Sequence, residues 1–124
     1  MKRKQLTKKQ REEVWEKYNH HCAYCGCELE YKDMQVDHFS SVLMADFHPE
    51  LRENLETIEN YFPACRMCNF YKGAGGIELL RKNLSRLYIQ LERQFDYRLA
   101  KKYGLVKETP HEIKFYFEEF DNEV

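Results

Sequence analysis

The chain has 124 residues, of which 43% are hydrophobic and 15% aromatic, and its formal net charge is −1. This length fits a single domain, 1–124, with a modest core that would gain from a metal staple. No segment approaches the roughly 20 apolar residues of a membrane span, and the charged stretch Met1–Gln5 lacks the apolar part of a secretory leader. We therefore expect a cytoplasmic protein with no membrane partner, in which paired cysteines indicate metal rather than disulfide.

Charge is unevenly distributed along the chain. Residues 1–11 carry six Lys or Arg and no acid, 28–60 carry nine acids against two bases, and 66–102 carry nine bases against three acids. An ordinary solvated surface would explain either basic segment alone. Basic segments on both sides of a carboxylate-containing stretch also suit a phosphodiester substrate held near a bound cation.

The first predicted element is a helix over about 7–19. Thr7 and Gln10 have the spacing of a capping box, in which each side chain bonds the backbone N–H of the other residue. The helix would place three large side chains against the core: Val14, Trp15 and Tyr18.

Residues 28–39 predict a β-hairpin. Leu29 and Tyr31 precede a turn around Lys32, and the alternating positions Met34, Val36 and His38 follow it. Beyond it, Pro49–Leu55 could form a short helix with proline in its first turn.

A long amphipathic helix is predicted after the glycines at 73, 75 and 76. Its apolar residues recur at spacings of three and four: Ile77, Leu80, Leu84, Leu87, Leu91, Phe95 and Leu99. Lys101 and Lys102 before Gly104 are typical of a helix end, and a break near 94–96 is an alternative to one continuous helix. In the tail, Thr109 could cap a helix, but the alternation of Ile113, Phe115 and Phe117 favours a strand.

Four of the five cysteines form two Cys-x-x-Cys pairs. Each pair supplies two thiolates at the separation that tetrahedral zinc requires, and Gly26 suits the turn of the first pair. Four sulfurs leave no open position for water, so we expect a structural zinc rather than a catalytic one. Its ligands would be Cys22, Cys25, Cys65 and Cys68. Cys27 is either an alternative ligand or a small, partly buried residue.

The cysteines belong to a longer pattern, which adds Asp37-His38, Glu59-Asn60, Asn69 and Lys72-Gly73. This pattern resembles the zinc-stapled, four-cysteine branch of the HNH endonuclease family over the motif core 22–73. The resemblance implies an α+β fold with a small ββα-metal core. Around this core we expect the N-terminal helix and a C-terminal extension, 77–124, made of a long helix and a short terminal strand.

The resemblance also implies catalytic roles. His38 would be the general base, since neutral imidazole can accept a proton from water near working pH. Asn60 would hold the other ring nitrogen of His38 through its side-chain oxygen. Asp37 and Asn69 would offer oxygen ligands to one Mg²⁺ or Mn²⁺ ion.

Two basic residues, Lys72 and Arg66, would contact substrate phosphates. The family often has glycines and a shorter spacing after Asp-His, whereas this chain has an insertion around 40–55, which makes Asn54 an alternative middle asparagine. The short distance to Cys65 favours Asn60.

The function expected from this resemblance is a divalent-metal-dependent endonuclease acting on nucleic acid, with DNA as the first expectation. One alternative is a zinc-clamped nucleic-acid-binding module without catalysis, which needs only the cysteines and the basic segments. Another is a protein-interaction adapter that uses the helix 77–103 and the aromatic tail 115–117.

Overall fold

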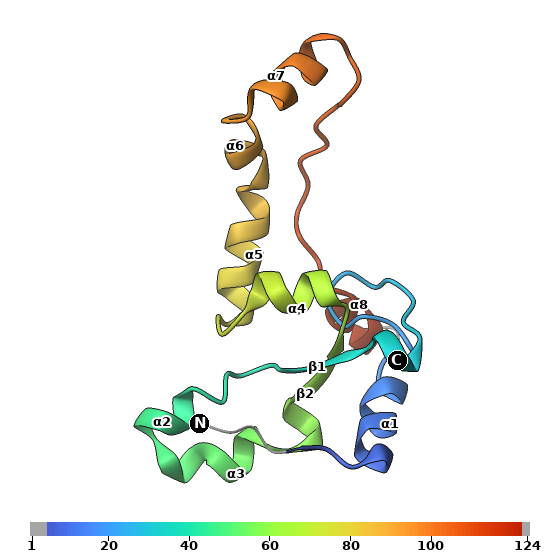
Figure 1. Ribbon diagram of the computed structural model, residues 1–124, viewed down its shortest axis with the longest axis vertical. Coiled ribbons are helices and arrows are strands. Elements are labelled where there is room, and N and C mark those ends of the chain that lie inside the picture. The colour runs from blue at the N-terminus through green and yellow to red at the C-terminus, as the bar shows by residue number, and fades with distance from the viewer. Residues whose placement is uncertain (1–4, 123–124) are drawn as a thin grey trace. The chain divides into compact units, whose positions relative to one another are not determined.

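The computed structural model describes residues 5–122, which form a small mixed α+β structure with a two-stranded antiparallel sheet and several helices (Figure 1). The basic positions 2–4 lie outside the described residues. The chain divides into two compact units. The first contains the residues up to Ile77 together with those from Lys114 onward, and the second is Glu78–Ile113. Among the described residues, no helix has the length and apolar character needed to cross a bilayer.

Helix α1, Lys8–Glu16, begins with the predicted capping box. The Gln10 backbone N–H donates to Thr7 Oγ1 at 3.1 Å, and the Thr7 N–H donates to Gln10 Oε1 at 3.0 Å. The side chains of Val14 and Tyr18 are buried as expected, whereas Trp15 is partly exposed. The helix ends slightly earlier than predicted, because Asn19 and His20 take φ angles of 54° and 66° and turn the chain towards the first cysteine pair.

The sheet consists of β1, Gln35–His38, and β2, Tyr61–Ala64. Their register places Gln35 opposite Ala64 and His38 opposite Tyr61. The predicted β1 residues are therefore confirmed as a strand, but a hairpin within 28–39 is wrong. Residues Tyr31–Asp33 form a 3₁₀ turn, η1, and the Leu29 N–H bonds the carbonyl of His20 at 2.7 Å instead of facing β1.

Short elements fill the segment between the strands. Those of the insertion are α2, Met44–Phe47; η2, Pro49–Leu51; and α3, Arg52–Leu55; and η3, Ile58–Asn60, follows it. Pro49 begins a helical turn as predicted, although the turn is 3₁₀ before it becomes α3. Val42, Ala45 and Leu55 pack together with Leu51 in a small core of their own. The insertion is thus an ordered subdomain.

Helix α4, Arg66–Lys72, begins within the second cysteine pair and runs through Asn69 to Lys72, where a short helix was predicted. Its N-cap is Cys65, whose sulfur accepts a hydrogen bond from the Cys68 N–H at 3.4 Å. It ends at Gly73, where φ is 55°. The sulfur that could bind a metal therefore also caps the helix.

The tail forms a helix, α8, Tyr116–Asn122, and the predicted terminal strand is wrong. The N–H groups of Tyr116 and Phe117 bond the carbonyls of Tyr24 and Ala23 at 3.0 and 2.8 Å, and the chain then coils. The alternation of apolar residues in the tail does not reflect a strand. Phe115 and Phe117 instead both pack edge-on against Tyr24.

In the second unit, the predicted long helix is divided into α5, Ile77–Ser85, α6, Leu87–Leu91, and α7, Phe95–Lys102. The break before Phe95 agrees with the expected alternative, whereas the break at Arg86 was not predicted. Ser85 Oγ donates to the Arg81 carbonyl at 2.8 Å, a bond that bends helices. α7 ends at Lys101 and Lys102 as expected, before Gly104 with a φ of 73°.

Candidate metal centre and adjoining buried site

The four cysteines of the two Cys-x-x-Cys pairs lie together. Their sulfurs are all within 4.8 Å of one another, although the pairs are far apart in sequence. A tetrahedral zinc with Zn–S bonds of about 2.3 Å would give sulfur–sulfur edges of about 3.8 Å. Cys25 Sγ and Cys65 Sγ are 3.9 Å apart, so the group could hold a metal ion such as zinc with little adjustment.

Backbone contacts hold the first cysteine pair against the sheet. The Ala23 N–H donates to the Pro63 carbonyl of β2 at 2.8 Å. Gly26 has a φ of 80°, which confirms the expected turn, and a Cβ there would lie 3.0 Å from Cδ2 of Tyr116. The turn therefore requires glycine for both its backbone angle and its close packing.

The four thiols differ in how readily they ionise. The hydrogen bond from Cys68 lowers the pKa of Cys22 to about 4 despite burial. The same bond, together with burial, raises the pKa of Cys68, and burial raises the pKa of Cys25. One thiolate thus opposes ionisation of its neighbours, and a divalent cation would allow all four to ionise.

Cys27 lies beside this group but outside it among the described residues. Its side chain is exposed, and desolvation followed by the neighbouring Cys25 raises its pKa to about 12. Cys27 is therefore neither one of the four clustered sulfurs nor the partly buried residue that we expected.

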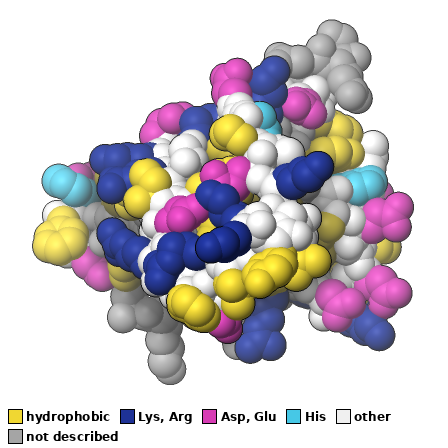
Figure 2. Space-filling model, turned by 90° about the horizontal axis from the view of Figure 1, so that it is seen from above, with side chains coloured by type: hydrophobic (Ala, Val, Ile, Leu, Met, Phe, Trp, Pro, Cys, Tyr) yellow, Lys and Arg dark blue, Asp and Glu magenta, His cyan; other side chains and the backbone are white. Residues whose placement is uncertain are grey.

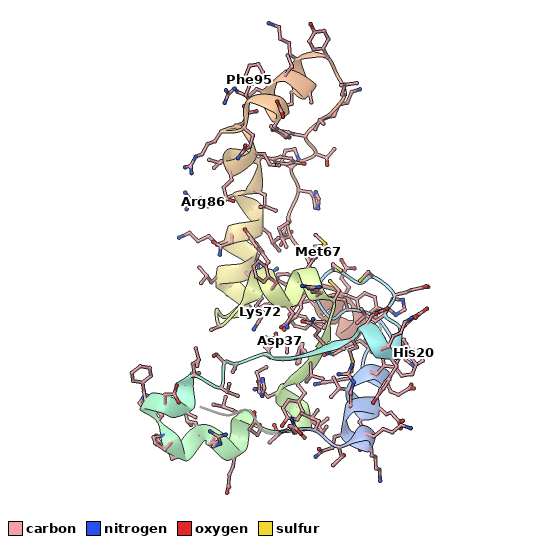
Figure 3. All side chains as sticks on the ribbon, viewed as in Figure 1. His20, Asp37, Met67, Lys72, Arg86 and Phe95 are labelled. Atoms are coloured by element: carbon pink, nitrogen blue, oxygen red, sulfur yellow. The ribbon has the colours of Figure 1, made fainter. Side chains whose placement is uncertain are left out.

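A buried ion pair lies where β1 faces α4, and Tyr24 of the first cysteine turn contacts it. Lys72 Nζ is 3.0 Å from Asp37 Oδ2, with side-chain exposures of 0% and 7% (Figure 3). The Tyr24 hydroxyl donates to the same oxygen at 2.5 Å, and Lys72 also donates to the His38 carbonyl at 3.1 Å. Burial and the Asp37 charge raise the pKa of Tyr24, so the phenol stays a donor.

This arrangement changes the expected role of Lys72. We predicted a contact with substrate phosphate, but the ammonium is buried and neutralises Asp37. Arg66 is exposed and lines a surface cavity with Lys32 and Gln35, and its contact with a phosphate stays a prediction.

His38 follows Asp37 on β1 and is also buried. Its Nε2 pairs with Glu56 Oε1, and the two side chains are only 7% and 6% exposed. The imidazole meets the Tyr61 ring edge-on, with centroids 5.3 Å apart. Among the described residues, His38 Nδ1 is a buried polar atom without a hydrogen-bond partner.

Asn60 does not hold His38, in contrast to our expectation. Its Oδ1 accepts the Ser40 N–H at 2.8 Å, and its Nδ2 donates to the carbonyls of Ser40 and Leu55 at 2.9 and 2.8 Å. The amide is thus used to close the insertion at its base. Asn60 positions the loop that carries Glu56, rather than the imidazole itself.

Asn69 lies on α4 and donates from Nδ2 to Gln35 Oε1 at 2.7 Å. Gln35 and Asp37 share one face of β1, since side chains alternate along a strand. Asn69 and Lys72 share one face of α4, since residues three apart are neighbours on a helix. The two oxygen-bearing residues predicted as ligands, Asp37 and Asn69, thus belong to facing surfaces of β1 and α4.

Sequence reasoning missed the partners of these residues. Tyr24 lies inside the first cysteine turn, where only its neighbours drew attention. Glu56 lies in the insertion, and no spacing rule linked it to His38 because the path of the insertion was not predictable. A buried acid at the end of a short helix carries no distinct sequence signal.

Comparison of the chain with protein-family models, with curated proteins and with solved structures gave no match.

Proposed function

We propose that the chain is a divalent-metal-dependent endonuclease of the HNH type that hydrolyses phosphodiester bonds in nucleic acid, with DNA as the first candidate substrate. The observation that carries the proposal is the conjunction of two buried side chains at successive positions of β1: His38, which has one ring nitrogen without a partner among the described residues, and Asp37. The order β1, β2, α4 and the four clustered cysteines also support it.

His38 would act as the general base. Its Nδ1 would accept a proton from the attacking water, while Tyr61 and Glu56 limit rotation of the ring. Because Nδ1 is buried in the free protein, substrate binding must admit water to it.

Asp37 and Asn69 are the residues that would hold Mg²⁺ or Mn²⁺ through side-chain oxygens. When bound, such an ion stabilises the charge that develops on the phosphate and on the leaving oxygen. Lys72 already neutralises one Asp37 oxygen, so we expect weak binding of the ion by the free protein. Substrate phosphate would complete the ligand set, as is usual for Mg²⁺.

The surface charge is compatible with a polyanionic substrate. Figure 2 shows Lys and Arg side chains gathered on the face that it presents, with hydrophobic and acidic side chains among them. Arg66 is one exposed base of the first unit. Neutralisation of phosphates by such side chains makes binding strongly dependent on salt.

The test is conversion of supercoiled plasmid by the metal-loaded protein in Mg²⁺ or Mn²⁺. His38→Ala should abolish nicking while keeping metal content and circular dichroism unchanged. His48→Ala is the matched control, because His48 is exposed in the insertion and pairs with a neighbouring carboxylate at 3.5 Å. Equal activity of His38→Ala and wild type would disprove catalysis at this site.

A second candidate is a nucleic-acid-binding module without catalysis. The Asp37–Lys72 pair favours it, because a carboxylate already neutralised by a buried ammonium has less need of a cation. Salt-dependent DNA binding with no cleavage in either metal would support this function over the first.

A further inference from the structure

The contact between His38 and Glu56 joins two buried side chains from distant parts of the chain. An ionised carboxylate can only accept hydrogen bonds, whereas each nitrogen of a neutral imidazole either donates or accepts. When a neutral imidazole contacts an ionised carboxylate, the nitrogen that faces the carboxylate carries the proton and the opposite nitrogen keeps its lone pair. In this protein the ring nitrogen that faces Glu56 is Nε2.

The position of Glu56 is well defined. It is the C-cap of α3, and its backbone N–H donates to the Arg52 carbonyl at 3.1 Å. The preceding residue, Leu55, is buried in the small core of the insertion, and its carbonyl accepts from Asn60. The backbone of Glu56 is thus held in place by its own hydrogen bond and by the buried, hydrogen-bonded residue that precedes it.

The remaining neighbours of His38 restrict the ring without competing for its nitrogens. Tyr61 meets the ring edge-on, and burial together with the Glu56 charge raises the pKa of Tyr61. The Lys72 ammonium bonds the His38 carbonyl rather than the imidazole. Among these neighbours, Glu56 is the one whose side chain contacts a ring nitrogen.

We propose that Glu56 is a positioning residue that fixes His38 in the Nε2–H tautomer and leaves Nδ1 as the proton acceptor. The catalytic consequence rests on the proposed function. The tautomer itself does not, since it follows from the contact between the two side chains. A general base whose tautomer is set by a carboxylate needs no rearrangement before it accepts a proton.

The first measurement is two-bond ¹H–¹⁵N correlation of the histidine side chains in the full, metal-loaded chain. Wild type should show His38 with a proton on Nε2 alone, and that proton should exchange slowly. Glu56→Gln, which keeps the shape but can also donate, should introduce the second tautomer and speed exchange of the Nε2 proton. Glu53→Gln is the matched control, because Glu53 is an exposed acid on the same short helix.

A wild-type His38 protonated on Nδ1, or on both nitrogens, would overturn the proposal. So would a Glu56→Gln spectrum identical to that of wild type. If Glu56→Gln does not fold, Glu56→Asp serves instead. The shorter carboxylate should keep the Nε2–H tautomer but shift its resonance, and loss of that tautomer in a folded Glu56→Asp chain would contradict the assignment.

The second measurement is a double-mutant cycle in plasmid nicking. Glu56→Gln should lower turnover at least about 10- to 100-fold, the range seen when the outer partner of a metal-binding imidazole is removed, with little change in KM. In the His38→Ala background it should cause no further loss. An equal loss in both backgrounds would show that Glu56 acts only through general structure. Absence of nicking by wild type would refute the proposed function, and the spectra alone would then decide the role of Glu56.

Discussion

At the scale of single residues, the five cysteines have distinct environments. Cys65 contributes one of the four clustered sulfurs and also caps α4, whereas Cys27 is exposed beside the cluster. A serine at 65 could still cap the helix through its hydroxyl, since serine is a favoured N-cap residue. Substitution at this position therefore separates the metal-binding role of the sulfur from its capping role.

Cys65→Ser should reduce bound zinc from about one ion per chain to a small fraction and destabilise the fold by more than about 4 kcal/mol, as loss of a structural metal does. Cys27→Ser should retain the metal and change stability by less than about 0.5 kcal/mol. Elemental analysis and urea unfolding measure both effects. Retention of a full equivalent of zinc by Cys65→Ser would contradict the assignment of the four ligands.

The buried pair of Asp37 and Lys72 makes a second prediction at this scale. Asp37→Asn keeps the shape of the side chain but leaves a buried ammonium without its counter-charge. Breaking a buried pair from one side typically costs about 3–5 kcal/mol, more than the pair contributes relative to apolar residues. We expect that loss in the free energy of unfolding of Asp37→Asn, measured in urea.

The partner substitution supplies the control for this prediction. Adding Lys72→Met to Asp37→Asn removes the stranded charge and should recover a large part of the lost stability. Asp33→Asn, at an exposed acid on η1, should be nearly neutral. If the double variant is less stable than Asp37→Asn, the ammonium is not stranded and the electrostatic account is wrong.

At the scale of elements, the insertion between the strands depends on one amide. Asn60 closes the segment at its base through hydrogen bonds to the backbone of Ser40 and Leu55. Asn60→Ala should therefore release this segment, at about 1 kcal/mol for each hydrogen bond lost. Hydrogen exchange should accelerate across 40–55 and remain slow in the sheet and α4.

Asn54→Ala is the matched control for this substitution. Asn54 is exposed on α3, and its backbone carbonyl, rather than its side chain, accepts a hydrogen bond from Thr57. Its replacement should leave exchange across the insertion unchanged. The comparison also distinguishes the two asparagines that the sequence left as alternatives, since equal protection in both variants would refute the closing role of Asn60.

These elements show which structural features the sequence could predict. Capping residues and paired cysteines act locally, so α1, α4 and the sulfur cluster were predictable. β2 was not, because all four of its residues are buried and one is Pro63, which removes both the alternation and the usual strand composition. The helix break at Arg86 depends on a hydroxyl bond from Ser85 that periodicity does not reveal.

The candidate site was predictable to the same extent. Asp37 and His38 were identified by their place in a pattern of spaced residues. Their partners belong to other segments, the one between the strands and the first cysteine turn. The contacts of Glu56 with His38 and of Tyr24 with Asp37 depend on the tertiary fold of the chain, which local sequence patterns do not predict. Lys72 has a typical phosphate-binding side chain, yet its burial could be learned only from the packing of α4 on β1.

At the scale of the whole molecule, the four clustered sulfurs all belong to the first unit and connect distant segments of it. The sulfurs join the segment after α1 to the N-terminus of α4, and β1 and the insertion lie between these positions in sequence. The second unit has its own contacts, such as the Tyr97 hydroxyl on Glu108 at 2.8 Å and the Thr109 N–H on the Tyr88 hydroxyl at 2.9 Å. Metal removal should therefore disrupt the first unit directly.

Trp15 is the single tryptophan of the chain and reports on this unit. Its ring stacks on His20 at 3.5 Å, close in sequence to the first cysteine pair, and its indole N–H donates to the Leu29 carbonyl at 2.9 Å. Both partners belong to the segment that the sulfurs hold in place. Loss of the metal should expose the indole to water and shift its emission to longer wavelength.

Chelation should produce this shift and lower the unfolding midpoint, because structural zinc contributes roughly 10 kcal/mol or more to small domains at neutral pH. One equivalent of Zn²⁺ should restore the emission. Mg²⁺ should not, since thiolates are poor ligands for hard cations. If the chelated chain keeps the emission and midpoint of the loaded protein, the cysteine cluster does not stabilise the fold through a metal ion.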